Sequence, residues 1–381
     1  MRDRKNMGTR TAGANMALHG DRGRVVTTNR SVILDTLCHT DSLSRAQIAE
    51  LTGIPLPTVH RLCAQLRKEG IIQESAKNRD GRGRPVRLLH LNPSFHAVLV
   101  VNIRGTTIDG AVVSLNDRIL HEEHMPQPHD EDKGGTGSRI RAIATMARLL
   151  DRWAADRSIP CTGMGVAVPG IVQNDGTVTA ASELGWNEVP LGDILRTAGK
   201  GPVLIENNAN AYAYGEALAG AGKNHNPVVG YTIRHFGVGA GIVVDGCILR
   251  GSHGMAGEMG YTLTSRESLD KYYTYGGDLE WQISQISAVE NQPSEQREEA
   301  LIDLISLSIG DICLVADPEI IVLDIAPTLP GQRILKGIRR RLIGRIPHMP
   351  DLAATQLGRK APLIGMGELI SQQVRMAAFN V

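Results

Sequence analysis

Residues 44–72, SRAQIAELTGIPLPTVHRLCAQLRKEGII, predict two short helices joined by a tight turn. Ser44 suits the N-cap of the first helix, and Gln47 follows three residues later, as a capping box requires. Gly53 can adopt the left-handed conformation that ends a helix, and Pro57 fits the first turn of the next one. Apolar residues then recur at helical spacing: Val59, Leu62, Cys63 and Leu66. This pattern is typical of a helix-turn-helix.

The second of these helices is the candidate DNA-reading element. In a helix-turn-helix the second helix lies in the major groove, with its N-terminal residues at the base edges. Its outward positions are therefore the expected DNA contacts: Thr58, His60, Arg61 and Gln65. A preceding helix over Arg30–Leu37 would complete a three-helix core.

A charged hairpin follows the helices. A strand over Ile71–Gln73 and a returning strand over Val86–Leu91 enclose KNRDGRGRPVR. Glycines allow the backbone to approach DNA closely, and arginines suit a narrow minor groove. We expect Arg82 and Arg84 to contact DNA, which makes residues 25–92 a winged helix-turn-helix domain. The alternative is a mobile charged loop, and the adjacent helices favour the DNA interpretation.

The charge distribution supports a polyanionic partner for this region alone. Residues 1–90 contain 16 Lys and Arg against 8 Asp and Glu, whereas the remainder contains 25 against 32. A basic segment attached to an acidic body indicates that only the basic segment meets nucleic acid. Residues 1–24 are polar and basic, and we expect a disordered extension there, either touching phosphates or inert.

Composition excludes several protein classes. The length of 381 residues is enough for two or three domains. No apolar run approaches the ~18 residues of a membrane span, and the first residues contain no apolar signal segment. The 5 cysteines are scattered and form no CxxC pair. We therefore expect a cytoplasmic protein without disulfides, membrane contact or a cysteine-rich zinc site.

Residues 93–381 alternate short strands with helices, which predicts an α/β body of two lobes around a cleft. We expect one lobe at about 93–205 together with a C-terminal helix, and the other at 206–365.

Three polar or glycine-rich loops of this body are candidate ligand contacts: Glu206–Asn210 (ENNAN), His235–Gly241 (HFGVGAG) and Gly251–Gly260 (GSHGMAGEMG). Polar residues at the carboxyl end of a strand usually face the ligand crevice of an α/β fold. Helix capping by Asn207 or Asn208, an ordinary glycine hairpin and a solvated Glu258 are the respective alternatives.

Four segments together resemble the ROK family, which comprises bacterial sugar kinases and sugar-responsive repressors. They are VPGIVQNDGTVTAASELGWNEVPL (168–191), ENNANAYAYGEALAGAG (206–222), FGVGAGIVVDGCILRGSHGMAGEMGY (236–261) and ADPEIIVLD (316–324). The resemblance implies an actin-like, ribonuclease H-like body whose two α/β lobes hold a sugar between them. The fused helix-turn-helix is similar to the repressor branch, which includes N-acetylglucosamine and xylose repressors.

Two departures from the kinase pattern indicate binding without catalysis. The resemblance implies an Asp at the phosphate site and an Asp as general base, and this chain has Asn102 and Asn208 there. An amide cannot accept the proton of the sugar hydroxyl, although it can still hydrogen-bond that hydroxyl. We therefore predict no catalytic residue and no cofactor. The sugar contacts implied by the resemblance are Asn207, Asn208, Glu258 and Glu280, with Glu183 as a weaker candidate.

The family's structural zinc is also predicted to be absent. The resemblance implies one His and three Cys ligands. Here Tyr261 stands at the His position, Asp278 stands at the last Cys position, and Thr262–Glu280 contains no cysteine. Zinc needs about four ligands, and the thiolates are missing.

The sequence therefore predicts a sugar-responsive transcriptional regulator, a repressor of carbohydrate uptake or catabolism genes. It would bind palindromic double-stranded operator DNA as a homodimer or homotetramer. The runner-up is an ATP-dependent sugar kinase with an accessory DNA-binding domain. A third alternative is an activator, or a DNA-binding protein that has lost its ligand.

Overall fold

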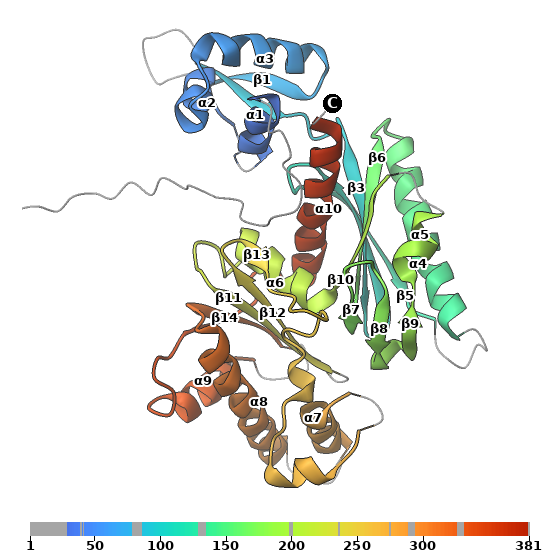
Figure 1. Cartoon of the computed structure of the whole chain (residues 1–381), viewed down its shortest axis with the longest axis vertical. Helices are drawn as coiled ribbons and strands as arrows, with labels where there is room; N and C mark the ends of the chain where they lie inside the picture. Colours follow the sequence, from blue (N-terminus) through green and yellow to red (C-terminus); the bar gives the residue numbers. More distant parts are fainter. Residues whose placement is uncertain are drawn as a thin grey trace, which may run out of the picture.

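The computed structural model describes residues 29–38, 40, 42–77, 86–128, 135–197, 201–234, 237–273, 276–288, 294–325 and 331–379. Figure 1 shows a small N-terminal head (residues 29–91) above two larger lobes, with helix α10 running from beside the head down along the strands β3 and β6. The expected extension at 1–24 and the wing-tip residues Arg82 and Arg84 lie outside the described residues.

The head contains three helices and a two-stranded hairpin: α1 (Asn29–Cys38), α2 (Arg45–Thr52), α3 (Leu56–Lys68), β1 (Ile72–Lys77) and β2 (Val86–Leu91). The Ser44 hydroxyl accepts a hydrogen bond from the Gln47 N–H, and the Gln47 side chain accepts one from the Ser44 N–H. Gly53 ends α2 with a φ of 70°. The capping box and the turn glycine predicted from the sequence are thus confirmed.

Lobe 1 is built on a five-stranded mixed sheet. Its strands, in spatial order, are β10 (Val203–Asn207), β6 (Cys161–Val168), β3 (Ala97–Arg104), β4 (Thr107–Ser114) and β5 (Ile119–Pro126). Alternate side chains of β3 enter different cores. Val98 and Val100 join the cluster that includes α10 (Ala361–Phe379), whereas Leu99 and Val101 join that of α4 (Gly135–Ala155). This period of two buries both faces of the strand.

A small antiparallel sheet extends lobe 1 towards the cleft. It consists of β7 (Ile171–Val172), β8 (Val178–Ala181) and β9 (Trp186–Val189), and it is accompanied by η1 (Ser182–Leu184) and α5 (Leu191–Arg196).

Lobe 2 has a second five-stranded sheet, in the order β13 (Cys247–Ile248), β12 (Gly237–Val244), β11 (Val228–Arg234), β14 (Ile320–Ile325) and β15 (Asp351–Ala354). One face packs on α7 (Asp278–Ala288), α8 (Ser294–Ala316) and α9 (Gly331–Leu342), and the other on α6 (Asn208–Ala219). Three short 3-10 helices complete the lobe: η2 (Met259–Tyr261), η3 (Arg266–Asp270) and η4 (Gly358–Lys360).

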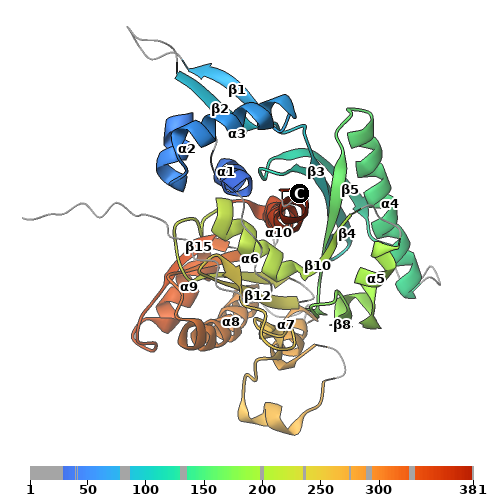
Figure 2. The ribbon, with the colours of Figure 1, turned by 45° about the horizontal axis from the view of Figure 1, so that its top comes forward.

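Helices α6 and α10 join the two lobes. Figure 2 views α10 nearly end-on, beside α6 and the sheet of lobe 1. A Cβ atom on Gly365 would lie 2.0 Å from the Ala211 carbonyl oxygen, and one on Gly215 would lie 2.0 Å from the Ala361 carbonyl oxygen. The glycines therefore allow the two helix backbones to touch, which ties α10 closely to the start of lobe 2.

Two expected boundaries within the body need correction. The first sheet does not end at residue 205, because β10 pairs with β6 in parallel through Asn207. The C-terminal helix begins at Ala361, inside the stretch assigned to the second lobe up to residue 365. Pro362 is compatible with this earlier start, since a proline in the first helical turn has no N–H bond to lose.

Candidate functional site

A cavity of about 540 Å³ lies between the lobes. All five sugar-contact residues expected from the sequence line it, together with Asn102: Glu183, Asn207, Asn208, Glu258 and Glu280. They come from separate elements, namely η1, the β10–α6 junction, the loop before η2, and α7. The size of the cavity falls within the range of small-molecule sites in proteins.

The junction of β10 and α6 gives Asn207 two roles at once. Its Oδ1 caps α6 by accepting hydrogen bonds from the N–H groups of Ala209 (2.7 Å) and Asn210 (3.1 Å). Its Nδ2 donates to the Gly170 carbonyl (2.8 Å) and to Glu258 Oε1 (3.3 Å). The capping and cleft-facing interpretations left open by the sequence therefore both hold.

The side chain of Glu206 stabilises this junction through hydrogen bonds, a role that the sequence pattern does not indicate. The buried carboxylate accepts hydrogen bonds from the Asn207 N–H and Asn210 Nδ2, both at 2.9 Å. Its other oxygen accepts from Arg250 Nε at 2.8 Å. Because each of these bonds involves a charged group, they restrain the junction strongly.

Asn208, at the start of α6, stands where the sequence resemblance implies a general base, and it lines the cavity. The Asn208 Nδ2 donates to the Ile103 carbonyl oxygen of lobe 1 at 3.3 Å. An amide in this place offers one hydrogen-bond donor group and one acceptor, but it does not take up a proton. Asn208 thus suits contact with a hydroxyl.

Three carboxyl groups gather around the remaining part of the cavity. Burial, and then the neighbouring charge of Glu280, raise the pKa of Glu258 to about 7. Burial also raises the pKa of Glu280, despite a hydrogen bond from the Val238 N–H, and the charge of Glu183 adds to the rise. Carboxyl groups near their pKa values can accept or donate hydrogen bonds, which suits a ligand with several hydroxyls.

The residues at the position where the resemblance implies a structural zinc do not fit zinc. Asp278 accepts hydrogen bonds from the Thr264 N–H, the Thr264 hydroxyl and the Ser268 hydroxyl, each at 2.6 Å, and from the Tyr273 hydroxyl. Burial alone would raise the pKa of this carboxyl, but hydrogen bonds from Ser268, Thr264 and Tyr273 hold it well below its usual range.

The Asp278 cluster therefore supplies oxygen donors and hydroxyls, without the thiolates that structural zinc sites use. In the described part of the chain, no group of three or more His, Cys, Asp and Glu side chains is arranged to hold a metal ion. The carboxylate of Asp278 ties together the loop that leads from Tyr261 to Glu280.

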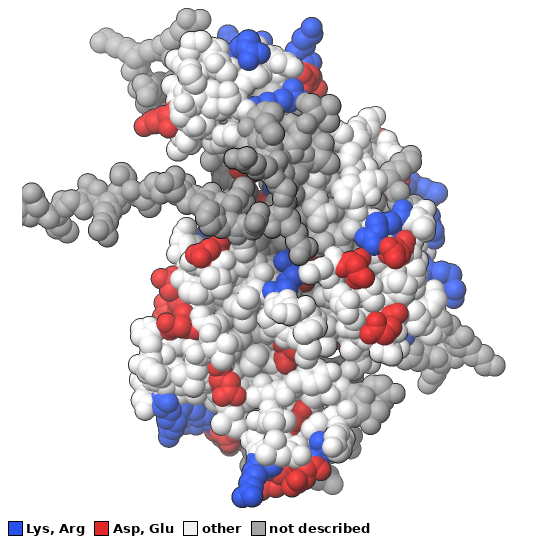
Figure 3. All heavy atoms as spheres, in the orientation of Figure 1, with Lys and Arg blue, Asp and Glu red and all other residues white. Residues whose placement is uncertain are grey.

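In the head, α3 presents most of the expected DNA contacts. His60, Arg61 and Gln65 are exposed, and Thr58 is half-buried. Gln65 Nε2 donates to Glu69 (3.0 Å), whereas Arg61 makes no hydrogen bond or ion pair with any described residue. Lys68 is also exposed, seven positions after Arg61. Residues seven apart lie on the same face of a helix, so the sequence already placed Lys68 on the same face as Arg61. Figure 3 shows basic side chains at this outer end of the head.

The base of the wing carries surplus positive charge. Three arginines surround the single carboxylate of Glu74: Arg45 at 2.9 Å, Arg67 at 2.6 Å and Arg87 at 3.4 Å. One carboxylate balances one of these cations, so the region keeps a net positive potential that favours phosphate.

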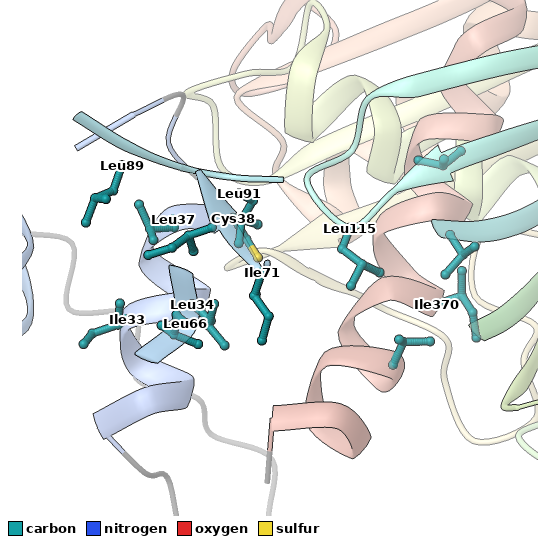
Figure 4. Packing of buried hydrophobic residues seen from close by; sticks show 14 of the residues in the cluster. Ile33, Leu34, Leu37, Cys38, Leu66, Ile71, Leu89, Leu91, Leu115 and Ile370 are labelled. Atoms are coloured by element: carbon teal, nitrogen blue, oxygen red, sulfur yellow. The ribbon is translucent and has the colours of Figure 1, made fainter. Parts of the chain in front are cut away.

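Helix α10 links the cavity to the head. Pro362, in its first turn, lines the cavity. Farther along, Ile370 and Val374 belong to the same buried cluster as Leu37 and Cys38 of α1 and Leu115 of lobe 1. Figure 4 shows these groups from α1, the β4–β5 turn and α10 approaching one another.

A buried polar cluster lies beside that contact. Arg375 donates to Glu368 Oε1 at 2.6 Å and to the Leu115 carbonyl at 2.8 Å. Burial, followed by the charge of Glu368 and a hydrogen bond with it, raises the pKa of Asp117 to about 9.

Comparison with known proteins assigns the body and the head to known domain families. Residues 98–272 match the model of the ROK family. This chain contains a ROK family domain. Residues 32–76 match the IclR helix-turn-helix domain. The predicted fold class, an N-terminal helix-turn-helix followed by a ROK body of mixed α/β sheets, is thereby confirmed.

Two known proteins are similar to this chain over nearly its whole length, head and body together. The chain is similar to the xylose repressor of Bacillus spizizenii, with 23% identity over 375 residues that cover 92% of this chain and 96% of the relative. A crystal structure of a ROK family transcriptional regulator, a homologue of the E. coli MLC protein, superimposes with a TM-score of 0.72 and 19% identity over 92% of this chain and 97% of that one.

The ROK body also resembles that of kinases. A crystal structure of a ROK family glucokinase from Streptomyces griseus, in complex with glucose and AMPPNP, superimposes with a TM-score of 0.58 and 22% identity. The superposition covers 72% of this chain and 99% of the glucokinase chain. No described helix has the length and apolar character needed to cross a bilayer.

Proposed function

We propose that this protein is a sugar-responsive transcriptional repressor of carbohydrate uptake or catabolism genes. It binds operator DNA through the head and a sugar in the cavity between the lobes, and it does not phosphorylate that sugar. The observation that carries the proposal is the course of α10, which begins at the cavity and packs with its later turns against α1 of the DNA-binding head. Relatives named xylose repressors, matched over nearly their whole length, support the same function.

In this proposal a sugar acts by stabilising one arrangement of the lobes. A ligand that contacts Asn207 and Asn208 from one side and Glu258 and Glu280 from the other binds better when the lobes are close together. Binding then shifts the population towards that arrangement. Because α10 packs against both lobes and the head, its displacement changes the spacing of two heads in a homodimer or homotetramer. Operator half-sites one helical turn apart tolerate little change in spacing.

The amides at 102 and 208 argue against the kinase alternative. Asn208 occupies the place of the proton acceptor, and Asn102 replaces the carboxylate expected at the phosphate site. The xylose repressor relatives favour regulation over catalysis in the same way.

Fluorescence anisotropy tests the proposal. The full chain is titrated into labelled duplexes from the region flanking its own gene, at several salt concentrations. We expect sequence-selective, salt-sensitive binding. Arg61→Ala should weaken specific binding by about 1–3 kcal/mol and relax sequence preference, because base contacts carry that discrimination. Arg148→Ala, at an exposed site in lobe 1, is the matched control.

Two outcomes would contradict the proposal. One is binding that shows no sequence preference at any salt concentration. The other is sugar-dependent release of ADP from ATP in a coupled assay across a panel of hexoses and pentoses, which would establish the kinase instead.

A further inference from the structure

The cavity contains two arginines that the sugar-binding residues do not account for. Arg104, at the end of β3, and Arg359, in η4, both line it. They belong to segments 255 positions apart in the chain, and the fold brings both to the wall of one cavity. Neither matches a residue that the ROK resemblance assigns to sugar contact.

The two guanidinium groups are sparsely bonded. A guanidinium group has five N–H donors. Within the described residues the Arg104 side chain makes no hydrogen bond, and its Nη1 is buried without a hydrogen-bond partner. The carboxylate of Asp324 lies 4.0 Å from Arg104 Nη2, at the outer limit of an ion pair. Arg359 donates to Asp109 at 2.6 Å and keeps 54% of its side chain exposed. Most N–H donors of the two side chains therefore have no hydrogen-bond acceptor among the described residues.

The two cations act on each other. Burial lowers the pKa of Arg104, the charge of Asp109 opposes this, and the charge of Arg359 lowers it further. The carboxylates of Asp109 and Asp324 offset the repulsion between these like charges, and an anionic ligand between the two guanidinium groups would lower it further. An amide at Asn102, where the resemblance implies a carboxylate, removes a negative charge that would repel such an anion.

The two arginines and the carboxyl groups come from different elements of the cavity wall: Arg104 ends β3 and Arg359 lies in η4, whereas Glu258 precedes η2 and Glu280 lies in α7. Neither arginine is among the groups that shift the pKa values of Glu258 and Glu280. The cavity thus has one region suited to hydroxyls and another suited to an anion. A volume of about 540 Å³ accommodates both parts of one ligand.

We propose that Arg104 and Arg359 bind the phosphate or carboxylate group of an anionic sugar whose hydroxyls contact Asn207, Asn208 and the neighbouring carboxyls. The inference rests on the proposed sugar-sensing function and specifies the chemical class of the effector. Planar guanidinium groups recognise both anions through paired hydrogen bonds. The preference for a charged ligand originates in the two arginines, and recognition of the sugar ring originates in the other residues.

Thermal-shift titrations of the full chain test this assignment. The probes are glucose, xylose, glucose 6-phosphate, glucose 1-phosphate, xylose 5-phosphate, glucuronate, inorganic phosphate and AMPPNP. We expect at least one charged sugar to bind about tenfold or more tightly than its neutral parent, as charge-assisted hydrogen bonds imply. The phosphate esters and glucuronate distinguish the two kinds of anionic group.

Variants assign the preference to the arginines. Arg104→Gln and Arg359→Gln should remove most of the advantage of the charged sugar and leave binding of the neutral parent within about twofold. Arg196→Gln, which alters an exposed arginine paired with Asp193 in lobe 1, should leave both unchanged. Melting temperatures without ligand show that each variant is folded.

Other outcomes overturn the inference in distinguishable ways. If neutral sugars bind as tightly as charged ones, the anion site is wrong and the sugar-sensing function stands. If no sugar of either kind binds while DNA binding persists, both the anion site and sugar sensing are wrong. If AMPPNP binds and the charged sugars do not, the arginines serve a nucleotide and the kinase alternative gains support.

Discussion

Replacement of Arg375 by methionine should destabilise the protein strongly and in a pH-dependent manner. Arg375 and Glu368 lie 2.6 Å apart, and their side chains are 5% and 1% exposed. Removing one partner of a buried ion pair typically costs about 3–5 kcal/mol, because the other charge stays buried without compensation. The variant also loses the hydrogen bond to the Leu115 carbonyl. We add no separate free-energy term for it, because both contacts are made by the same guanidinium group.

The pH dependence follows from the carboxyl groups that remain. The pKa of Asp117 is already raised to about 9, so this carboxyl is protonated at neutral pH. In the Arg375→Met variant the Glu368 carboxylate loses its buried counter-charge, and burial then favours its neutral, protonated form. The folded variant therefore binds one proton more than the folded wild type, and its stability falls more steeply as the pH increases. We expect the destabilisation relative to wild type to be larger at pH 8 than at pH 5.

Urea denaturation of the full chain at pH 5, 6.5 and 8 measures this effect. Arg196→Met is the matched control, because Arg196 and Asp193 also lie 2.6 Å apart but are 43% and 78% exposed. An exposed pair contributes less than about 1 kcal/mol. The double variant Arg375→Met, Glu368→Gln should recover much of the lost stability. Equal destabilisation by the two single variants, or a loss that does not change with pH, would refute the reasoning.

Two further predictions concern the Asp278 cluster and the cavity. Asp278→Asn should lower the free energy of unfolding by about 2–4 kcal/mol, because several hydrogen bonds lose their charged acceptor. Asp270→Asn, at an exposed position of the same loop, should have little effect, and EDTA should change neither wild-type melting temperature nor sugar binding. Sugar affinity should rise about tenfold from pH 6 to pH 8, because Glu258 ionises with a pKa of about 7 and the carboxylate accepts hydroxyl hydrogen bonds. Titration calorimetry checks this, and Glu258→Gln should abolish the dependence.

The head could be predicted from sequence because its signals are local. Ser44 and Gln47 form their capping box within one turn, and Gly53 needs no distant partner to end α2. The cavity residues Asn207 and Glu258 were predicted through motifs that lie directly on strand-to-helix or strand-to-loop junctions. In each case the information sits within a few residues of the position itself.

The remaining features depend on contacts that the linear pattern does not contain. Arg104 and Arg359 line the same cavity only once both lobes are folded and packed together. In the sequence, nothing distinguishes Arg359 from the many arginines that lie on the protein surface. The contact of Ile370 with the α1 core depends on how the head docks on the body, which no helical periodicity encodes. Asp278 was recognised as a departure from the zinc pattern. Its hydrogen-bond partners became visible only in three dimensions.

The most direct test of the account is the affinity of the full chain for its operator duplex, measured by anisotropy with and without a saturating sugar that raises its melting temperature. The account predicts that the ligand weakens operator binding by tenfold or more, that Arg61→Ala weakens it with or without ligand, and that the sugar is recovered chemically unchanged. An operator affinity that stays constant while the sugar demonstrably occupies the cavity would contradict it.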